Sequence, residues 1–137
     1  MLRERSTADY ILSQALPSLP AEEMAALVMR AQGGDRAARE LAIRRCILFV
    51  AMIARSGKCR RLYLHYKEDS LTIGMSAVDH AIDKFDPSRG ATFLTYCKWA
   101  IQNRLERRGF ELVASVRQPD RKASQVFAEL NNKSLDA

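Results

Sequence analysis

Apolar residues recur along the chain at the spacing of amphipathic helices, and the clearest stripe lies in the middle of the sequence. It is formed by Leu71, Met75, Val78, Ile82 and Phe85. Because positions three or four residues apart share one face of a helix, the stripe predicts a core-facing helix over residues 69–85, with Asp69 or Ser70 as its cap. No strand-like alternation persists anywhere in the sequence. The predicted class is therefore all-α, a compact helical bundle.

Further helices are predicted on both sides of this stripe, because glycine, proline and capping residues divide the chain into segments of helical length. These segments are residues 20–32, 36–55, 92–108 and 120–131. Asp35 is placed to cap the second of them and Gly109 to end the third. Residues 56–66 form a basic, partly irregular connector, and residues 86–90 form a turn in which proline fixes φ and glycine permits positive φ.

The helix predicted after this turn has two different faces when residues are spaced about 100° apart. A core-like stripe is formed by Leu94, Cys97, Ile101 and Leu105. A second arc is formed by Phe93, Tyr96, Trp99, Ala100 and Asn103, with Arg107 beside them. Bases stack on aromatic rings for about 1–3 kcal/mol each, so the second arc predicts a single-strand binding face. The alternative is that these rings pack on a neighbouring helix.

The net charge of the chain gives only partial support to a nucleic-acid partner. The chain has 137 residues and a formal net charge of +6, from 22 Lys and Arg against 16 Asp and Glu. That length fits one domain. A basic excess favours polyanionic partners, because cations near phosphates release counterions, but a merely basic surface gives the same balance.

Basic residues crowd the C-terminal part of the sequence against few acids. They are Lys98, Arg104, Arg107, Arg108, Arg117, Arg121 and Lys122. We expect them to line one DNA-facing surface and to make binding steeply dependent on salt. A solvated helix face is the alternative.

No pattern in the sequence is typical of an enzyme, a metal site or a membrane span. Cys46, Cys59 and Cys97 are widely spaced, and His65 and His80 lie outside any ligand pattern, so no metal or cofactor is expected. There is no nucleophile–base set and no phosphate-cradling glycine loop, so we expect no catalytic residues. The longest apolar run, residues 46–54, is too short to cross a bilayer. A cytoplasmic protein without membrane contact is expected.

The run DKFDPSRGATFLTYCKWAI, residues 83–101, resembles region 2 of the sigma-70 family of RNA polymerase sigma factors. The resemblance extends over most of the chain. Residues 1–19 resemble region 1.2, residues 20–112 the region 2 helical domain, and residues 113–137 the region 3.0 segment. No counterpart of the −35-reading region 4 follows. This favours a phage-encoded factor, or one half of a two-subunit factor whose other subunit contacts the −35 element.

The resemblance implies a transcription initiation factor that binds core RNA polymerase, through the clamp helices of its largest subunit, and binds and melts the −10 element of promoter DNA. The non-template strand is the main DNA partner. Positions matching the family's −10-binding residues are Phe93, Thr95, Tyr96, Trp99 and Asn103. The flanking cations Lys98, Arg107 and Arg108 are expected to contact the same DNA.

Two departures from the family pattern bear on this reading. The tandem tryptophan of the family is Trp99–Ala100 here, so half of that wedge is missing. The Gln-Glu pair that meets the polymerase clamp is replaced by Thr72–Ile73. The side of the helix expected to dock on polymerase comprises Asp69, Thr72, Ile73, Ser76 and His80. Ile73 could instead pack under the basic connector as ordinary core.

Two other functions stay open on the sequence. A sigma-like adaptor or decoy would bind polymerase without opening DNA, and the replaced Gln-Glu pair speaks for altered docking. A basic helical protein unrelated to polymerase would bind duplex DNA by itself. Retention of Tyr96 and Trp99 argues against a pure decoy.

Overall fold

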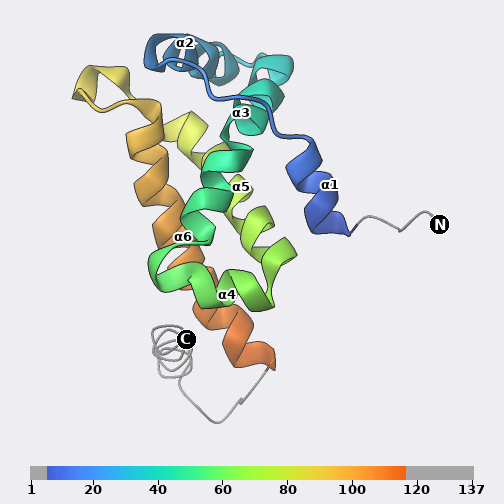
Figure 1. Cartoon of the computed structure of the whole chain (residues 1–137). Coiled ribbons are helices and arrows are strands. Elements are labelled where there is room, and N and C mark those ends of the chain that lie inside the picture. The colour runs from blue at the N-terminus through green and yellow to red at the C-terminus, as the bar shows by residue number, and fades with distance from the viewer. Residues whose placement is uncertain (1–5, 117–137) are drawn as a thin grey trace, which may run out of the picture.

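A computed structural model describes the backbone of residues 6–116, and the side chains of residues 6–109 and Glu111. Within that range all regular structure is helical, which confirms the predicted all-α class (Figure 1). The α-helices are α1 (Thr7–Ser13), α2 (Ala21–Gln32), α3 (Arg36–Ala54), α4 (Arg60–His65), α5 (Lys67–Lys84) and α6 (Phe93–Val116). None of these helices is long and apolar enough to cross a membrane. The predicted helix over residues 120–131 lies outside the described range.

The first two long helices begin and end where the sequence predicts. Gly33 and Gly34 separate α2 from α3, and Gly34 adopts a positive φ of 103° that favours glycine. The Asp35 carboxylate accepts a hydrogen bond of 3.1 Å from the Ala38 amide and so caps α3. The cap and the glycines are local features, which is why the sequence alone identifies them.

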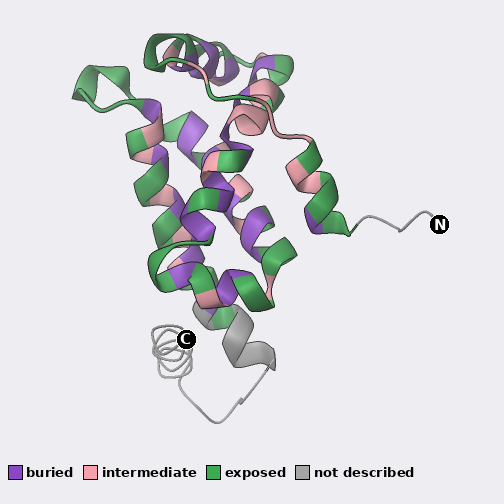
Figure 2. Ribbon diagram, in the orientation of Figure 1, coloured by how far each residue is buried: buried purple, intermediate pink, exposed green. Residues whose placement is uncertain are grey.

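Helices α3, α5 and α6 pack against one another and enclose the core, while α2 crosses one end of the bundle (Figures 1 and 2). The central stripe predicted for α5 is buried at Leu71, Val78, Ile82 and Phe85, whereas Met75 is half-buried. Gly74 lies between this stripe and α3, and a Cβ atom there would overlap the Cγ1 atom of Val50. The close approach of α5 to α3 therefore depends on glycine.

The predicted connector over residues 56–66 is mostly helical, which corrects the expectation of an irregular segment. A 3₁₀ turn over Gly57–Cys59 leads directly into α4, whose Leu62 and Tyr63 are buried. These apolar residues give the short helix a packed face. Of the basic side chains around them, Lys58 and Arg60 are exposed, whereas Arg61 is half-buried.

Two predicted helix boundaries are wrong. Helix α5 begins at Lys67, so Asp69 and Ser70 lie inside its first turn and neither caps it. Helix α6 continues through Gly109 to Val116. Gly109 is buried and does not have the positive φ that ends helices at glycine. Glycine inside a helix costs only about 1 kcal/mol relative to alanine, which packing can offset.

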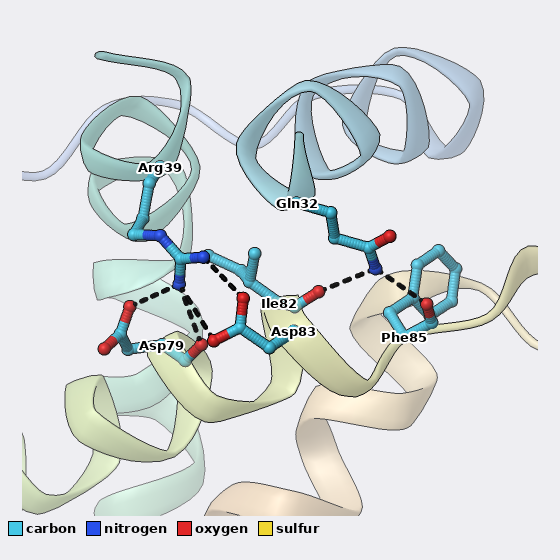
Figure 3. A network of polar contacts seen from close by, with 6 residues as sticks. All are labelled: Gln32, Arg39, Asp79, Ile82, Asp83 and Phe85. Carbon is cyan, nitrogen blue, oxygen red and sulfur yellow. Dashed lines mark hydrogen bonds and ion pairs between the residues drawn. The ribbon is translucent and has the colours of Figure 1, made fainter. Parts of the chain in front are cut away.

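A polar network anchors α2 and α3 to the C-terminal end of α5 (Figure 3). Gln32 Nε2 donates hydrogen bonds of 2.8 Å to the carbonyl oxygens of both Ile82 and Phe85. Arg39 pairs with Asp79 at 2.8 Å and also with Asp83. Because the last carbonyls of a helix have no partner within it, the amide of Gln32 holds the point where α5 ends and the next turn begins.

Replacing Asp83 by Asn is expected to flatten the acid part of the stability profile. Its hydrogen bond with the Arg39 guanidinium lowers the pKa of Asp83 below the ordinary value. A carboxyl with a lowered folded-state pKa contributes stability above its unfolded pKa and loses it as the pH falls through the folded pKa. Urea unfolding measured from about pH 7 down to pH 3 should show a smaller loss in the variant. The exposed Asp69→Asn is the control, and equal losses in wild type and Asp83→Asn would contradict the expectation.

Candidate nucleic-acid interface

The turn between α5 and α6 lies where the sequence predicts it, and local hydrogen bonds hold it. Asp86 accepts hydrogen bonds from the Ser88 amide at 3.0 Å and from the Ser88 hydroxyl at 2.7 Å. Gly90 has a φ of 87°, and the Thr92 hydroxyl accepts a 3.2 Å hydrogen bond from the Thr95 amide. Thr92 thus caps α6 and fixes the direction in which the following aromatic residues point.

Phe93 belongs to the core, which corrects its expected place on the DNA-facing arc. Its side chain is only 1% exposed and packs edge-on against Phe85, with ring centroids 5.3 Å apart. The buried row of α6 is Phe93, Cys97, Ile101 and Leu105. Leu94, expected in that row, is only half-buried. On the helical wheel, Phe93 and Leu94 lie on opposite flanks of the apolar stripe. Packing against α5 covers the flank of Phe93 and leaves Leu94 partly exposed.

Trp99 and Tyr96 stay accessible at the surface of the bundle. The Trp99 side chain is 63% exposed. Tyr96 is half-buried, and its ring centroid lies 6.4 Å from that of Phe85. The other expected DNA-binding side chains are exposed, namely Thr95, Lys98, Asn103, Arg107 and Arg108. Phe93 therefore supports the aromatic face from beneath, through Phe85.

A cleft of about 210 Å³ runs between α5 and α6 beside Trp99, and we call it the Trp99 cleft. Helix α5 contributes His80 and Lys84 to its lining. Helix α6 contributes Tyr96, Trp99, Asn103, Arg104 and Arg107. Aromatic, amide and cationic side chains are thereby combined in one concave surface. Sequence reasoning placed His80 on a separate polymerase-facing side, and it overlooked Lys84.

A second cleft, of about 390 Å³, lies at the turn before α6, and we call it the turn cleft. It is lined by Lys84, Phe85, Asp86, Arg89, Ala91 and Tyr96. Hydrogen bonds from the Ser88 hydroxyl and amide lower the pKa of Asp86, so its carboxylate stays ionised as an acceptor. Asp86 and Arg89, which form a 3.8 Å ion pair, were treated only as turn residues from sequence. Their adjacency to Tyr96 depends on how the turn folds back onto α6.

A third cleft, again of about 210 Å³, lies farther along the same two helices, and we call it the Arg108 cleft. Thr72, Ile73 and Ser76 of α5 line it together with Arg104 and Arg108 of α6. Ile73 is half-buried and packs against the core. Four of the five residues expected to dock on polymerase are exposed, namely Asp69, Thr72, Ser76 and His80. Of them, Asp69 is exposed and lines none of the three clefts.

Three of the four basic residues of α6 line these clefts, and the fourth, Lys98, is exposed and lines none of them. Arg104 lines both the Trp99 cleft and the Arg108 cleft, and Arg107 lines the former. The acidic residues near them are paired: Glu111 lies 3.6 Å from Arg108, and Glu106 lies 4.0 Å from Lys58. Arg117, Arg121 and Lys122, expected on the same surface, fall outside the described residues.

No family model matches the sequence. Among curated proteins, the chain is similar to the RNA polymerase sigma factor RpoS of Coxiella burnetii (strain RSA 493 / Nine Mile phase I), with 34% identity over 116 residues. The alignment covers 84% of this chain and 31% of the relative. The chain thus spans about a third of the length of this relative.

Proposed function

We propose that the chain is a sigma-type transcription initiation factor, a placement supported by its similarity to a sigma factor over 84% of its length. In this role it binds core RNA polymerase and engages one strand of a −10-type promoter element. The observation that carries the proposal is the joint position of Tyr96 and Trp99 on one cleft, whose polar lining includes Lys84, Asn103, Arg104 and Arg107.

The two clefts beside Tyr96 suit a strand whose bases are unstacked. Extruding a base from a duplex costs a few kcal/mol, and a pocket that stacks and hydrogen-bonds the base offsets this cost. An extruded base would enter the turn cleft against the Tyr96 ring, with Asp86 and Arg89 beside its polar edge. Trp99 would stack on the adjacent base pair, while Lys84 and Arg107 neutralise phosphates.

Strand separation would depend on a single tryptophan. Ala100 follows Trp99 and is half-buried, so no second ring extends the wedge. The exposed indole of Trp99 would therefore carry the stacking contribution that two rings supply in the family pattern. We therefore expect strand separation to depend more strongly on Trp99 than it does on either ring of the family's tandem tryptophan.

Docking on polymerase is the second part of the proposal, and the clamp helices of the largest subunit are the proposed partner. An adaptor or decoy is the other candidate function, favoured by Thr72–Ile73 in place of the Gln-Glu pair of the family pattern. Phage origin and a separate −35-binding subunit remain predictions. Promoter opening separates the two candidates, since a decoy binds polymerase and leaves DNA closed.

Replacing Trp99 by Ala tests the proposal directly. We expect binding of a −10-like single strand to weaken by about 1–3 kcal/mol, because one stacking platform is lost. The fold should be retained, since exposed side chains contribute little to stability. Fluorescence anisotropy with a labelled oligonucleotide measures the affinity, and permanganate reactivity of thymines in a complex with core polymerase measures opening.

Leu64→Ala is the matched control, since Leu64 is 62% exposed on α4 and lines none of the three clefts. It should leave both affinity and opening unchanged. Equal affinity of wild type and Trp99→Ala would remove the case for stacking. Polymerase binding without permanganate-reactive thymines in the wild type would favour the decoy.

A further inference from the structure

The three clefts follow one another along the seam between α5 and α6. The turn cleft and the Trp99 cleft share Lys84 and Tyr96, and the Trp99 cleft and the Arg108 cleft share Arg104. From Lys84 back to Thr72 the seam follows twelve residues of helix, a length of about 18 Å. A ligand that leaves the Trp99 cleft along α6 therefore reaches the Arg108 cleft directly.

The polar groups of the Arg108 cleft are suited to an anion. Arg104 and Arg108 line it together with Thr72 and Ser76, which carry hydroxyl groups, and no carboxylate belongs to the described lining. Guanidinium groups bind phosphate oxygens with paired, charge-assisted hydrogen bonds, and hydroxyl groups can donate further ones. The set provides several donors around a small volume.

Helix α5 places one exposed carboxylate near this surface, that of Asp69, which lies three residues before Thr72 and has no ion pair within the described part of the chain. Asp79 and Asp83 form ion pairs with Arg39 of α3. These pairs lie at the opposite end of the polar network from Gln32 (Figure 3). On α6, Glu111 accompanies Arg108, and Arg104 has no ion pair within the described part of the chain. Within the described residues, Lys84, Arg104 and Arg107 of the seam therefore form no ion pair, whereas Arg108 is shared with Glu111 at the exposed end.

We propose that the Arg108 cleft binds a backbone phosphate of the same DNA strand that occupies the Trp99 cleft. The seam is then one continuous nucleic-acid track, and Thr72 and Ser76 are DNA ligands rather than polymerase contacts. This inference rests on the proposed function. A carboxylate of a protein partner would suit the same donors, but Arg104, which lines both clefts, and the neighbouring cations Lys84 and Arg107 favour the strand.

The test uses the full chain and two labelled −10-like single strands, a short one and one extended by several nucleotides toward the Arg108 cleft. Arg108→Gln removes one phosphate-binding charge, and the pair Thr72→Val with Ser76→Ala removes both hydroxyl groups. We expect each variant to weaken binding of the extended strand about tenfold. Arg108→Gln should also make the slope of log affinity against log salt shallower by about 0.7. Binding of the short strand should not change.

Arg60→Gln, at an exposed position of α4, is the charge-matched control and should leave both strands unaffected. Affinity for core polymerase is measured on the same variants. One outcome overturns the inference: the variants bind core polymerase more weakly but bind the extended strand with the affinity of wild type. The cleft would then hold a protein.

The inference can also fail separately from the proposed function. This is the case if Trp99→Ala weakens strand binding, whereas the Arg108-cleft variants bind the extended strand with the same affinity as wild type. A wild-type chain that binds neither strand, alone or with polymerase, would overturn both the track and the proposed function.

Discussion

Replacing Phe93 by Ala is expected to lower the free energy of unfolding by about 3–5 kcal/mol, the range typical of a buried aromatic residue. The side chain is 1% exposed and forms an edge-to-face pair with Phe85, at an interplanar angle of 80°. Truncation leaves a cavity between α5 and α6 and removes this aromatic pair, which itself contributes about 0.5–1.5 kcal/mol. Urea unfolding followed by circular dichroism measures the change.

The same measurement separates a supporting role for Phe93 from direct contact with DNA. Phe93→Leu keeps most of the apolar volume and should recover much of the loss, whereas Trp99→Ala should change stability by no more than about 0.5 kcal/mol. A Phe93→Ala variant that is as stable as wild type but binds DNA more weakly would indicate that the Phe93 ring is exposed and contacts DNA. The contrast between Phe93 and Trp99 is therefore a test of which side of α6 is covered.

Replacing Gly74 by Ala is expected to destabilise the protein by about 1–3 kcal/mol, even though alanine favours helices. The added Cβ atom would overlap Cγ1 of Val50, a residue of α3 that is fully buried. Interiors are close-packed, so α3 and α5 would have to separate. Since α5 also forms one wall of the seam with α6, the same shift would disturb the clefts. Thermal or urea unfolding measures the effect.

A double substitution identifies the cause. Val50→Ala removes the atom that the new methyl group would overlap, so Gly74→Ala with Val50→Ala should cost less than the sum of the two single changes. Gly33→Ala is the control, because a Cβ there would lie 3.4 Å from the Arg30 carbonyl oxygen, in ordinary contact. It should change stability by no more than about 0.5 kcal/mol. Simple additivity of the two substitutions would show that the overlap is not the source of the loss.

The sequence by itself determined the helical class, most helix positions and the chemistry of one face. The cap at Asp35 and the turn over residues 86–90 depend on hydrogen bonds and φ angles within a few residues, so sequence reasoning can place them. The exposure of Trp99 and Asn103 was also predicted correctly. These residues lie far enough from the core row for the helical period alone to decide.

Tertiary structure decided the features that depend on which helix covers which flank. Phe93 and Leu94 are adjacent on either side of the apolar row, and only contact with Phe85 buries the first and leaves the second half-exposed. Gly109 could end a helix or lie within one. In the structure it is buried within α6, which continues to Val116. The clefts required both helices, since Arg104 lies near Ser76, and His80 near Trp99, only once α5 and α6 pack together. Residues far apart in sequence meet through packing of whole helices, and neither period nor local propensity contains that information.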